Sequence, residues 1–233
     1  MAKISRKELK TDRFALEVGH TFDYVEEHKR QILKYAGLAA AVLAALLAVF
    51  FYMRHRESVR QQDLAQAIRA LHAPVGEAGN PDSFPTPDAK NKAAAAALNS
   101  VIAKYPSSDE AMIARFGLAS QAVDVGNLAE AEKLFKQVAD SGIERFAPLA
   151  QLSLGEICFA TGRPAEGEKI LRGLIERPSI FVSSEEATVA LARQLASTKP
   201  TEARKLLEGV ASKTSSPTVS RTVVGLIGEL FNQ

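Results

Sequence analysis

The chain has 233 residues, a formal net charge of +2, 6% aromatic residues and no tryptophan. Its single cysteine, Cys158, cannot form an intrachain disulfide, and its four scattered histidines have no close ligand partner, so neither a disulfide framework nor a zinc site is expected. Beyond residue 34, Lys/Arg and Asp/Glu number 21 each. A neutral domain lacks the basic face that nucleic-acid binding requires, so nucleic acid is not an expected partner.

The first 34 residues form a charged tail that carries eight Lys/Arg and six Asp/Glu. Ser5 and Glu8 have the spacing of a capping box, and residues 21–34 show a helical pattern of polar side chains. We therefore expect a helical tail.

Residues 35–53 are the strongest local signal, because these 19 residues carry no charge. A helix rises about 1.5 Å per residue, so the segment covers roughly 28 Å, close to the hydrocarbon thickness of a bilayer. Tyr35 at one end and residues 50–52 at the other are the aromatic side chains typical of a membrane interface. A buried core helix or a cleaved signal peptide fits the length and the charged flank less well. We expect an uncleaved transmembrane helix in contact with the lipid bilayer.

The charges around this segment favour one orientation. The short tail holds eight basic residues, and short basic segments stay in the cytoplasm, whereas long domains can cross regardless of charge. The expected topology therefore has residues 1–34 in the cytoplasm and residues 54–233 outside it. Gly37, Ala41 and Ala45 lie four residues apart on the span, a spacing of small residues that lets two such helices pack closely. A homodimer formed through this contact is one possibility.

After the span, the helical pattern continues and then stops. Residues 54–73 place Leu64, Ala67 and Leu71 at helical spacing. Residues 74–88 contain four prolines and two glycines, a density that predicts a loop.

Residues 89–233 contain an internal repeat. Segments 128–135, 164–171 and 200–207 align without gaps, and their equivalent small residues are spaced by 36 residues. Each unit is predicted to be two antiparallel helices that cross closely at the small residue and bury their apolar faces against neighbouring units. Pro217 then begins a helix whose apolar face is expected to cap the last repeat.

This pattern resembles the tetratricopeptide repeat, although its period is 36 rather than about 34 and Thr198 replaces the third turn glycine. The resemblance implies an all-α fold, with an N-terminal transmembrane helix followed by an α-solenoid of about three to four helix pairs and a C-terminal capping helix. The expected repeat-packing residues are Ala119, Gly126, Ala131, Gly155, Gly162, Gly167 and Ala203.

In that family the first helix of each pair lines a concave, partner-binding face. Carried over to this sequence, the resemblance implies a mostly apolar groove suited to a protein segment. The expected groove residues are Phe116, Ser120, Val123, Asp124, Leu152, Glu156, Phe159, Thr188 and Ala192. A packing role between units is the alternative for Phe116, Leu152 and Phe159.

The whole layout is similar to the YfgM-like family of bacterial inner-membrane proteins, whose repeat domains face the periplasm. That resemblance implies partners among the Sec translocon, its periplasmic chaperones or secreted clients. The alternatives are a structural scaffold for a cell-envelope complex and a cytoplasm-facing regulatory scaffold.

Enzymatic chemistry is not expected. The sequence has no phosphate-binding glycine loop, nucleophile elbow or metal motif, so no cofactor is predicted. The carboxylate pairs at 109–110 and 185–186 precede apolar helices, where they favour the helix dipole. Cys158 is expected to be a buried, inert thiol.

Overall fold

The computed structural model describes residues 6–77, 80–143, 145–214 and 216–231, and Ser5 lies outside them. These residues form nine helices and one isolated bridge between Val75 and Phe84. The helices are α1 (Arg6–His72), α2 (Pro87–Lys104), α3 (Asp109–Asp124), α4 (Leu128–Ala139), α5 (Ala147–Ala160), α6 (Pro164–Glu176), α7 (Ser184–Leu195), α8 (Pro200–Lys213) and α9 (Pro217–Phe231). The predicted all-helical architecture is confirmed.

The chain divides into two compact units, and the division falls between Val59 and Arg60, inside α1. Before this point, the apolar side chains of residues 35–53 are exposed, as Leu38 (63%) and Phe51 (64%) show. Among the described residues, one helix is long and apolar enough to cross a membrane, the stretch of α1 from Lys29 to His72.

The second unit begins with the last turns of α1 and not with α2. Leu64 and Ala67 are buried in one apolar cluster with Leu98 of α2 and Ala114 of α3. Asp63 accepts hydrogen bonds from Lys104 and Tyr105, each at 3.0 Å. The sequence predicted a repeat domain that begins at residue 89 and does not include residues 54–73. In the structure, the second half of residues 54–73 supplies the first helix of the stack.

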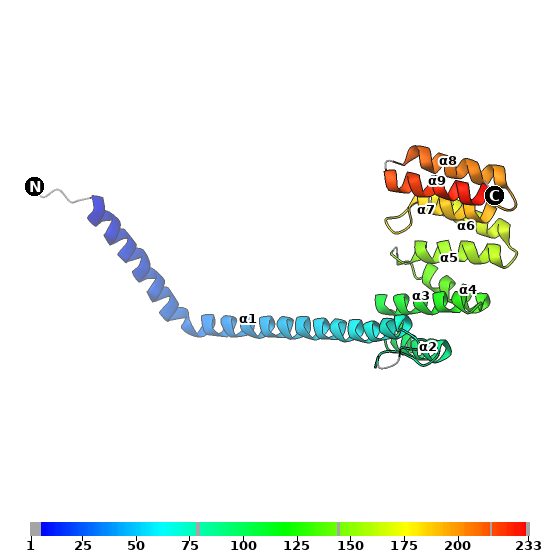
Figure 1. The fold of residues 1–233 in the computed structure, drawn as a ribbon. Coiled ribbons are helices and arrows are strands. Elements are labelled where there is room, and N and C mark those ends of the chain that lie inside the picture. Colours follow the sequence, from blue (N-terminus) through cyan, green and yellow to red (C-terminus); the bar gives the residue numbers. More distant parts are fainter. Residues whose placement is uncertain (1–5, 78–79, 144, 215, 232–233) are drawn as a thin grey trace, which may run out of the picture. The chain divides into compact units, whose positions relative to one another are not determined.

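Helices α3/α4, α5/α6 and α7/α8 form successive pairs, each of which packs on the next (Figure 1). Their buried faces make two further apolar clusters, centred on Phe135 and on Leu191. Helix α9 packs on α8 and buries Val223 and Leu226 against the last pair. The solenoid with a C-terminal helix agrees with the prediction.

Small residues mark the helix crossings. Ala119 of α3 and Ala131 of α4 are fully buried between these two helices. Ala203 of α8 is fully buried as well. Gly155 and Gly167 allow α5 and α6 to approach closely, because a β-carbon on Gly167 would lie 2.7 Å from the Gly155 carbonyl oxygen. The close crossing therefore requires glycine at position 167.

Two of the three turns within pairs use a glycine with positive φ. Gly126 has φ 76° and Gly162 has φ 75°. At the second of these turns, Arg163 N–H donates to the Cys158 carbonyl (2.8 Å) and Gly162 N–H to the Phe159 carbonyl (3.2 Å). This pairing is a Schellman motif, which needs a left-handed residue after the helix.

Candidate binding groove

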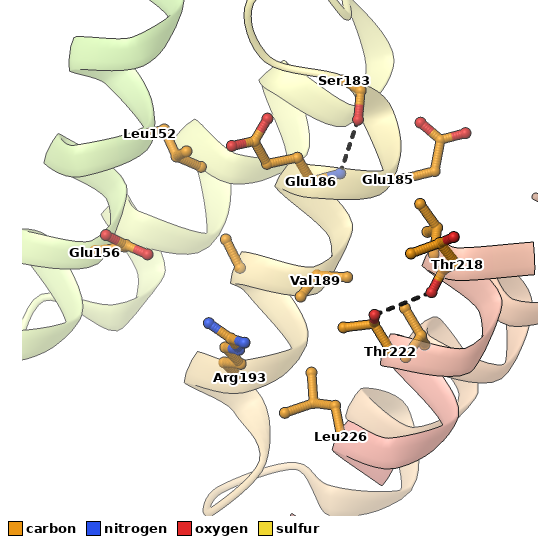
Figure 2. Close-up of a pocket in the computed structure, with 13 residues that line it drawn as sticks. Leu152, Glu156, Ser183, Glu185, Glu186, Val189, Arg193, Thr218, Thr222 and Leu226 are labelled. Atoms are coloured by element: carbon orange, nitrogen blue, oxygen red, sulfur yellow. Dashed lines mark hydrogen bonds between the residues drawn. The ribbon is translucent and has the colours of Figure 1, made fainter. Parts of the chain in front are cut away.

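Helices α5, α7 and α9 enclose a cavity of about 390 Å³ (Figure 2). These are the first helices of two consecutive pairs together with the helix that follows the last pair. The walls are mainly apolar, and the charged side chains come from α5 and α7. The apolar lining residues are Leu152, Val189, Ala190, Val219, Val223 and Leu226.

The start of α7 places two carboxylates at one end of the groove. The Ser183 hydroxyl accepts a hydrogen bond from the Glu186 backbone N–H at 3.0 Å and so caps the helix. Residues 186, 189 and 193 then recur at helical spacing on one face. Because a helix rises about 1.5 Å per residue, Arg193 lies roughly 10 Å along α7 from Glu186.

The α9 wall has no charge. Thr222 donates its hydroxyl hydrogen to the Thr218 carbonyl at 3.0 Å, so its donor is satisfied within its own helix (Figure 2). Val219, which is 37% exposed, lies on the same helix and lines the cavity. The electrostatic character of the groove therefore depends on α5 and α7.

Three carboxylates, of Glu156, Glu185 and Glu186, share the groove with one guanidinium, of Arg193. In the part of the chain that the structure describes, none of these four groups forms an ion pair. Partial desolvation by the groove walls raises the pKa of the Glu156 carboxyl above its ordinary value, and the charge of Arg193 opposes this shift. The groove lining therefore holds more carboxyl groups than guanidinium groups.

The structure places two of the predicted groove residues in this cavity, Leu152 and Glu156. Phe116 packs edge-to-face on Phe135 at a centroid distance of 5.1 Å, and Phe159 packs against the last apolar cluster. Ala192 is fully buried, so its assignment to a partner-binding surface is corrected: it is a packing residue.

The remaining predicted residues lie elsewhere. Thr188 is buried, donates to the Ser184 carbonyl at 2.6 Å, and lines a separate cavity of about 560 Å³ that α8 also lines. This corrects its assignment, because α7 turns that side chain toward the second helices. Ser120, Val123 and Asp124 lie on α3, and the cavity lining does not include them.

Sequence reasoning missed the α9 wall and the α7 residues Val189 and Arg193. A signal was present, because extending the 36-residue period from Gly155 through Leu191 reaches Ile227 in α9. Helix α9 therefore occupies the position of a first helix in a further unit. A helix in that position lines the groove as well as capping the core.

A second missed feature is a set of ion pairs on the second helices. Glu132 accepts from Arg163 at 2.5 Å and from Lys136 at 2.7 Å, while Arg163 also contacts Glu166 at 3.1 Å. Hydrogen bonds from Arg163 and Lys136 lower the pKa of the Glu132 carboxyl.

The same arrangement recurs 36 residues later. Glu168 accepts from Arg172 at 2.7 Å and from Lys199 at 2.9 Å, while Arg172 contacts Glu202 at 2.5 Å. Hydrogen bonds from Lys199 and Arg172 lower the pKa of Glu168. Each network ties one second helix to the start of the next, so we call these eight residues the ion-pair ladder.

Stacked antiparallel helix pairs, small residues at the crossings and a groove lined by first helices together define a helical-repeat interaction solenoid. The family model for the tetratricopeptide repeat-like domain matches residues 33–184, and the chain belongs to that family. Such repeats are protein-interaction scaffolds and are typically non-catalytic.

Solved structures agree with this fold. The chain is similar to two crystal structures of nearly identical TPR-like repeats from a Podosopora anserina protein assigned as a kinesin light chain, one of them a single-substitution variant. The variant is 17% identical with a TM-score of 0.55, covering 74% of this chain and 84% of that one. The other is 16% identical with a TM-score of 0.54, covering 74% and 85%. At these identities the likeness concerns the fold alone. No curated protein matches the chain.

Proposed function

We propose that this chain is a membrane-anchored scaffold whose groove between α5, α7 and α9 binds a segment of a partner protein. The observation that carries the proposal is the apolar cavity of about 390 Å³ formed by first helices of a repeat solenoid. Apolar walls with a few charged side chains suit a protein segment better than a small polar metabolite.

The anchor in this proposal is the exposed apolar segment 35–53 of α1. Side chains such as Leu46 and Phe50, 62% and 50% exposed, are unfavourable in water and favourable in lipid. Tethering the groove to a bilayer raises its local concentration near membrane-bound partners, so weak contacts suffice.

The proposed location is the bacterial inner membrane, with the N-terminus in the cytoplasm and the repeat domain in the periplasm. The YfgM-like layout supports a place beside the Sec translocon, where the groove would hold newly translocated chains or dock periplasmic chaperones. An envelope-assembly scaffold would use the same groove for one fixed partner, and a cytoplasm-facing scaffold would require the reverse topology.

Topology is tested by thiol labelling of intact cells with a membrane-impermeant reagent. Asp82 is exposed in the loop before α2, so Asp82→Cys provides the probe, and Cys158→Ala removes the buried native thiol. We expect labelling once the outer membrane is permeable to the reagent. Protection until the inner membrane is lysed would place the repeat domain in the cytoplasm and exclude the translocon.

Partner binding is tested by photo-crosslinking in cells from position 219 on the groove wall. The matched control is position 137, an exposed residue of α4 that does not line the groove. We expect adducts from position 219 only. Adducts with many different secreted chains would indicate client binding, whereas adducts with one fixed partner would indicate an assembly scaffold. Equal amounts of adduct from both positions would contradict a role for the groove.

A further inference from the structure

We infer that the groove selects a cationic, apolar protein segment, one with Lys or Arg beside aliphatic side chains. This inference rests on the proposed function and names the chemistry of the partner. The apolar walls from α5, α7 and α9 complement the aliphatic side chains of such a segment. The excess of carboxylates over guanidinium complements its Lys or Arg.

The carboxylates of the groove are free of ion pairs, whereas those on the other face of the solenoid are paired. In the ion-pair ladder, Glu132 and Glu168 each have two cationic partners within 3 Å. Glu156, Glu185 and Glu186 have none among the described residues. Glu156 lies within reach of the charge of Arg193, whereas Glu185 and Glu186 stand at the first turn of α7 and can meet a basic side chain of a ligand.

The charges of the groove are also ordered along α7. Glu185 and Glu186 stand at its first turn, and Arg193 stands in its last turn. Val189 lies between these ends, and Leu226 faces it from α9 (Figure 2). A bound segment therefore places its basic residue near the start of α7 and its aliphatic residues along Val189 and Leu226.

Charge complementarity favours this occupant over an acidic or a neutral one. An acidic segment would approach three carboxylates, and like-charge contacts in a confined site are unfavourable. A neutral apolar segment would fill the apolar walls but leave Glu185 and Glu186 at the first turn of α7 without a cationic side chain. A Lys or Arg side chain at that end supplies the missing opposite charge.

The test measures the affinity of the full chain, in a non-ionic detergent, for fluorescent peptides of one length. The peptides share an Ala/Leu sequence and carry two Lys, two Glu or two Gln at one end, and empty micelles correct for partitioning. We expect the Lys peptide to bind most tightly, and its affinity to fall as salt is raised from about 0.05 to about 0.5 M.

Substitutions separate the groove charge from the fold. Glu186→Gln and Glu156→Gln should each weaken binding of the Lys peptide about fivefold. Glu176→Gln, at an exposed position of α6 outside the groove, should leave it unchanged. Arg193→Gln should strengthen binding about fivefold, because it removes the competing cation, and a gain in affinity cannot come from unfolding.

Equal binding of the three peptides, or no weakening in Glu186→Gln and Glu156→Gln, would overturn the charge preference. The proposed function would then stand if crosslinks from position 219 still form. Loss of those crosslinks with no binding of any peptide would overturn both.

Discussion

At the residue scale, the close crossing of α5 and α6 depends on two glycines. A β-carbon at position 167 would lie 2.6 Å from Phe159 Cδ2 and 2.7 Å from the Gly155 carbonyl oxygen. The equivalent crossing of α3 and α4 has alanine at both positions, Ala119 and Ala131. The β-carbons that are present at that crossing would clash at the crossing of α5 and α6.

We expect Gly167→Ala to lower the free energy of unfolding by about 1–3 kcal/mol, because the backbone of α5 must move. Gly173→Ala lies on the same helix, where a β-carbon would meet nothing within 4 Å. That control should raise stability by about 0.5–1 kcal/mol, since alanine favours the helix. Thermal unfolding followed by circular dichroism measures both, and equal effects of one sign would contradict the crossing argument.

At the element scale, the three turns within pairs use two different backbone solutions. The turns after α3 and α5 close with glycine in the left-handed region. The turn after α7 has Thr198 at the equivalent position, and the Leu195 carbonyl accepts from Lys199 N–H at 2.7 Å instead. Among described residues, positive φ occurs only at glycines, so Thr198 has a negative φ and does not adopt the left-handed conformation.

Gly162→Ala should therefore destabilise the chain by about 1–2 kcal/mol, because an L-residue is strained in the left-handed region. Thr198→Gly should bring no gain and a small loss, because glycine only increases the entropy of the unfolded chain. Melting temperatures of the two variants provide the measurement. Stabilisation by Thr198→Gly would show that the third turn is strained.

At the scale of the whole molecule, the ion-pair ladder couples one repeat unit to the next. Solenoid stability depends on such contacts between neighbours, because each unit touches only the units beside it. Glu132 pairs with Lys136 and Arg163, and Arg163 also contacts Glu166. Its equivalent Glu168 pairs with Arg172 and Lys199, and Arg172 also contacts Glu202.

Both glutamates have a folded-state pKa below the ordinary value of 4.5, so their stabilisation is complete above that value and is lost as pH falls through the folded pKa. We expect the melting temperature to decrease as the pH is lowered below about 4.5. The double variant Glu132→Gln/Glu168→Gln should show a smaller decrease. Part of it should remain, because Lys104 and Tyr105 also lower the pKa of Asp63. An unchanged pH profile in the double variant would contradict the role of the ladder.

The sequence was informative wherever the determinants are local and periodic. Ala131, Gly167 and Ala203 recur every 36 residues because the same helix crossing recurs, and Gly126 and Gly162 end helices in the left-handed region. The groove was predicted less well, because which face of α7 meets solvent depends on how neighbouring pairs pack. Ala192 and Thr188 share that helix with Val189 and Arg193, and only the packing turns the first two inward.

The sequence by itself determined the all-helical solenoid, its 36-residue period and the apolar segment 35–53, because helix propensity, turn chemistry and hydrophobicity depend on residues close in the chain. Only the tertiary structure decided that Leu64 and Ala67 of α1 join the repeat core, that α9 forms a wall of the groove, and that Glu156 lies opposite Arg193. These contacts join residues far apart in the chain, and the burial of shared apolar surface selects them, which no local pattern records.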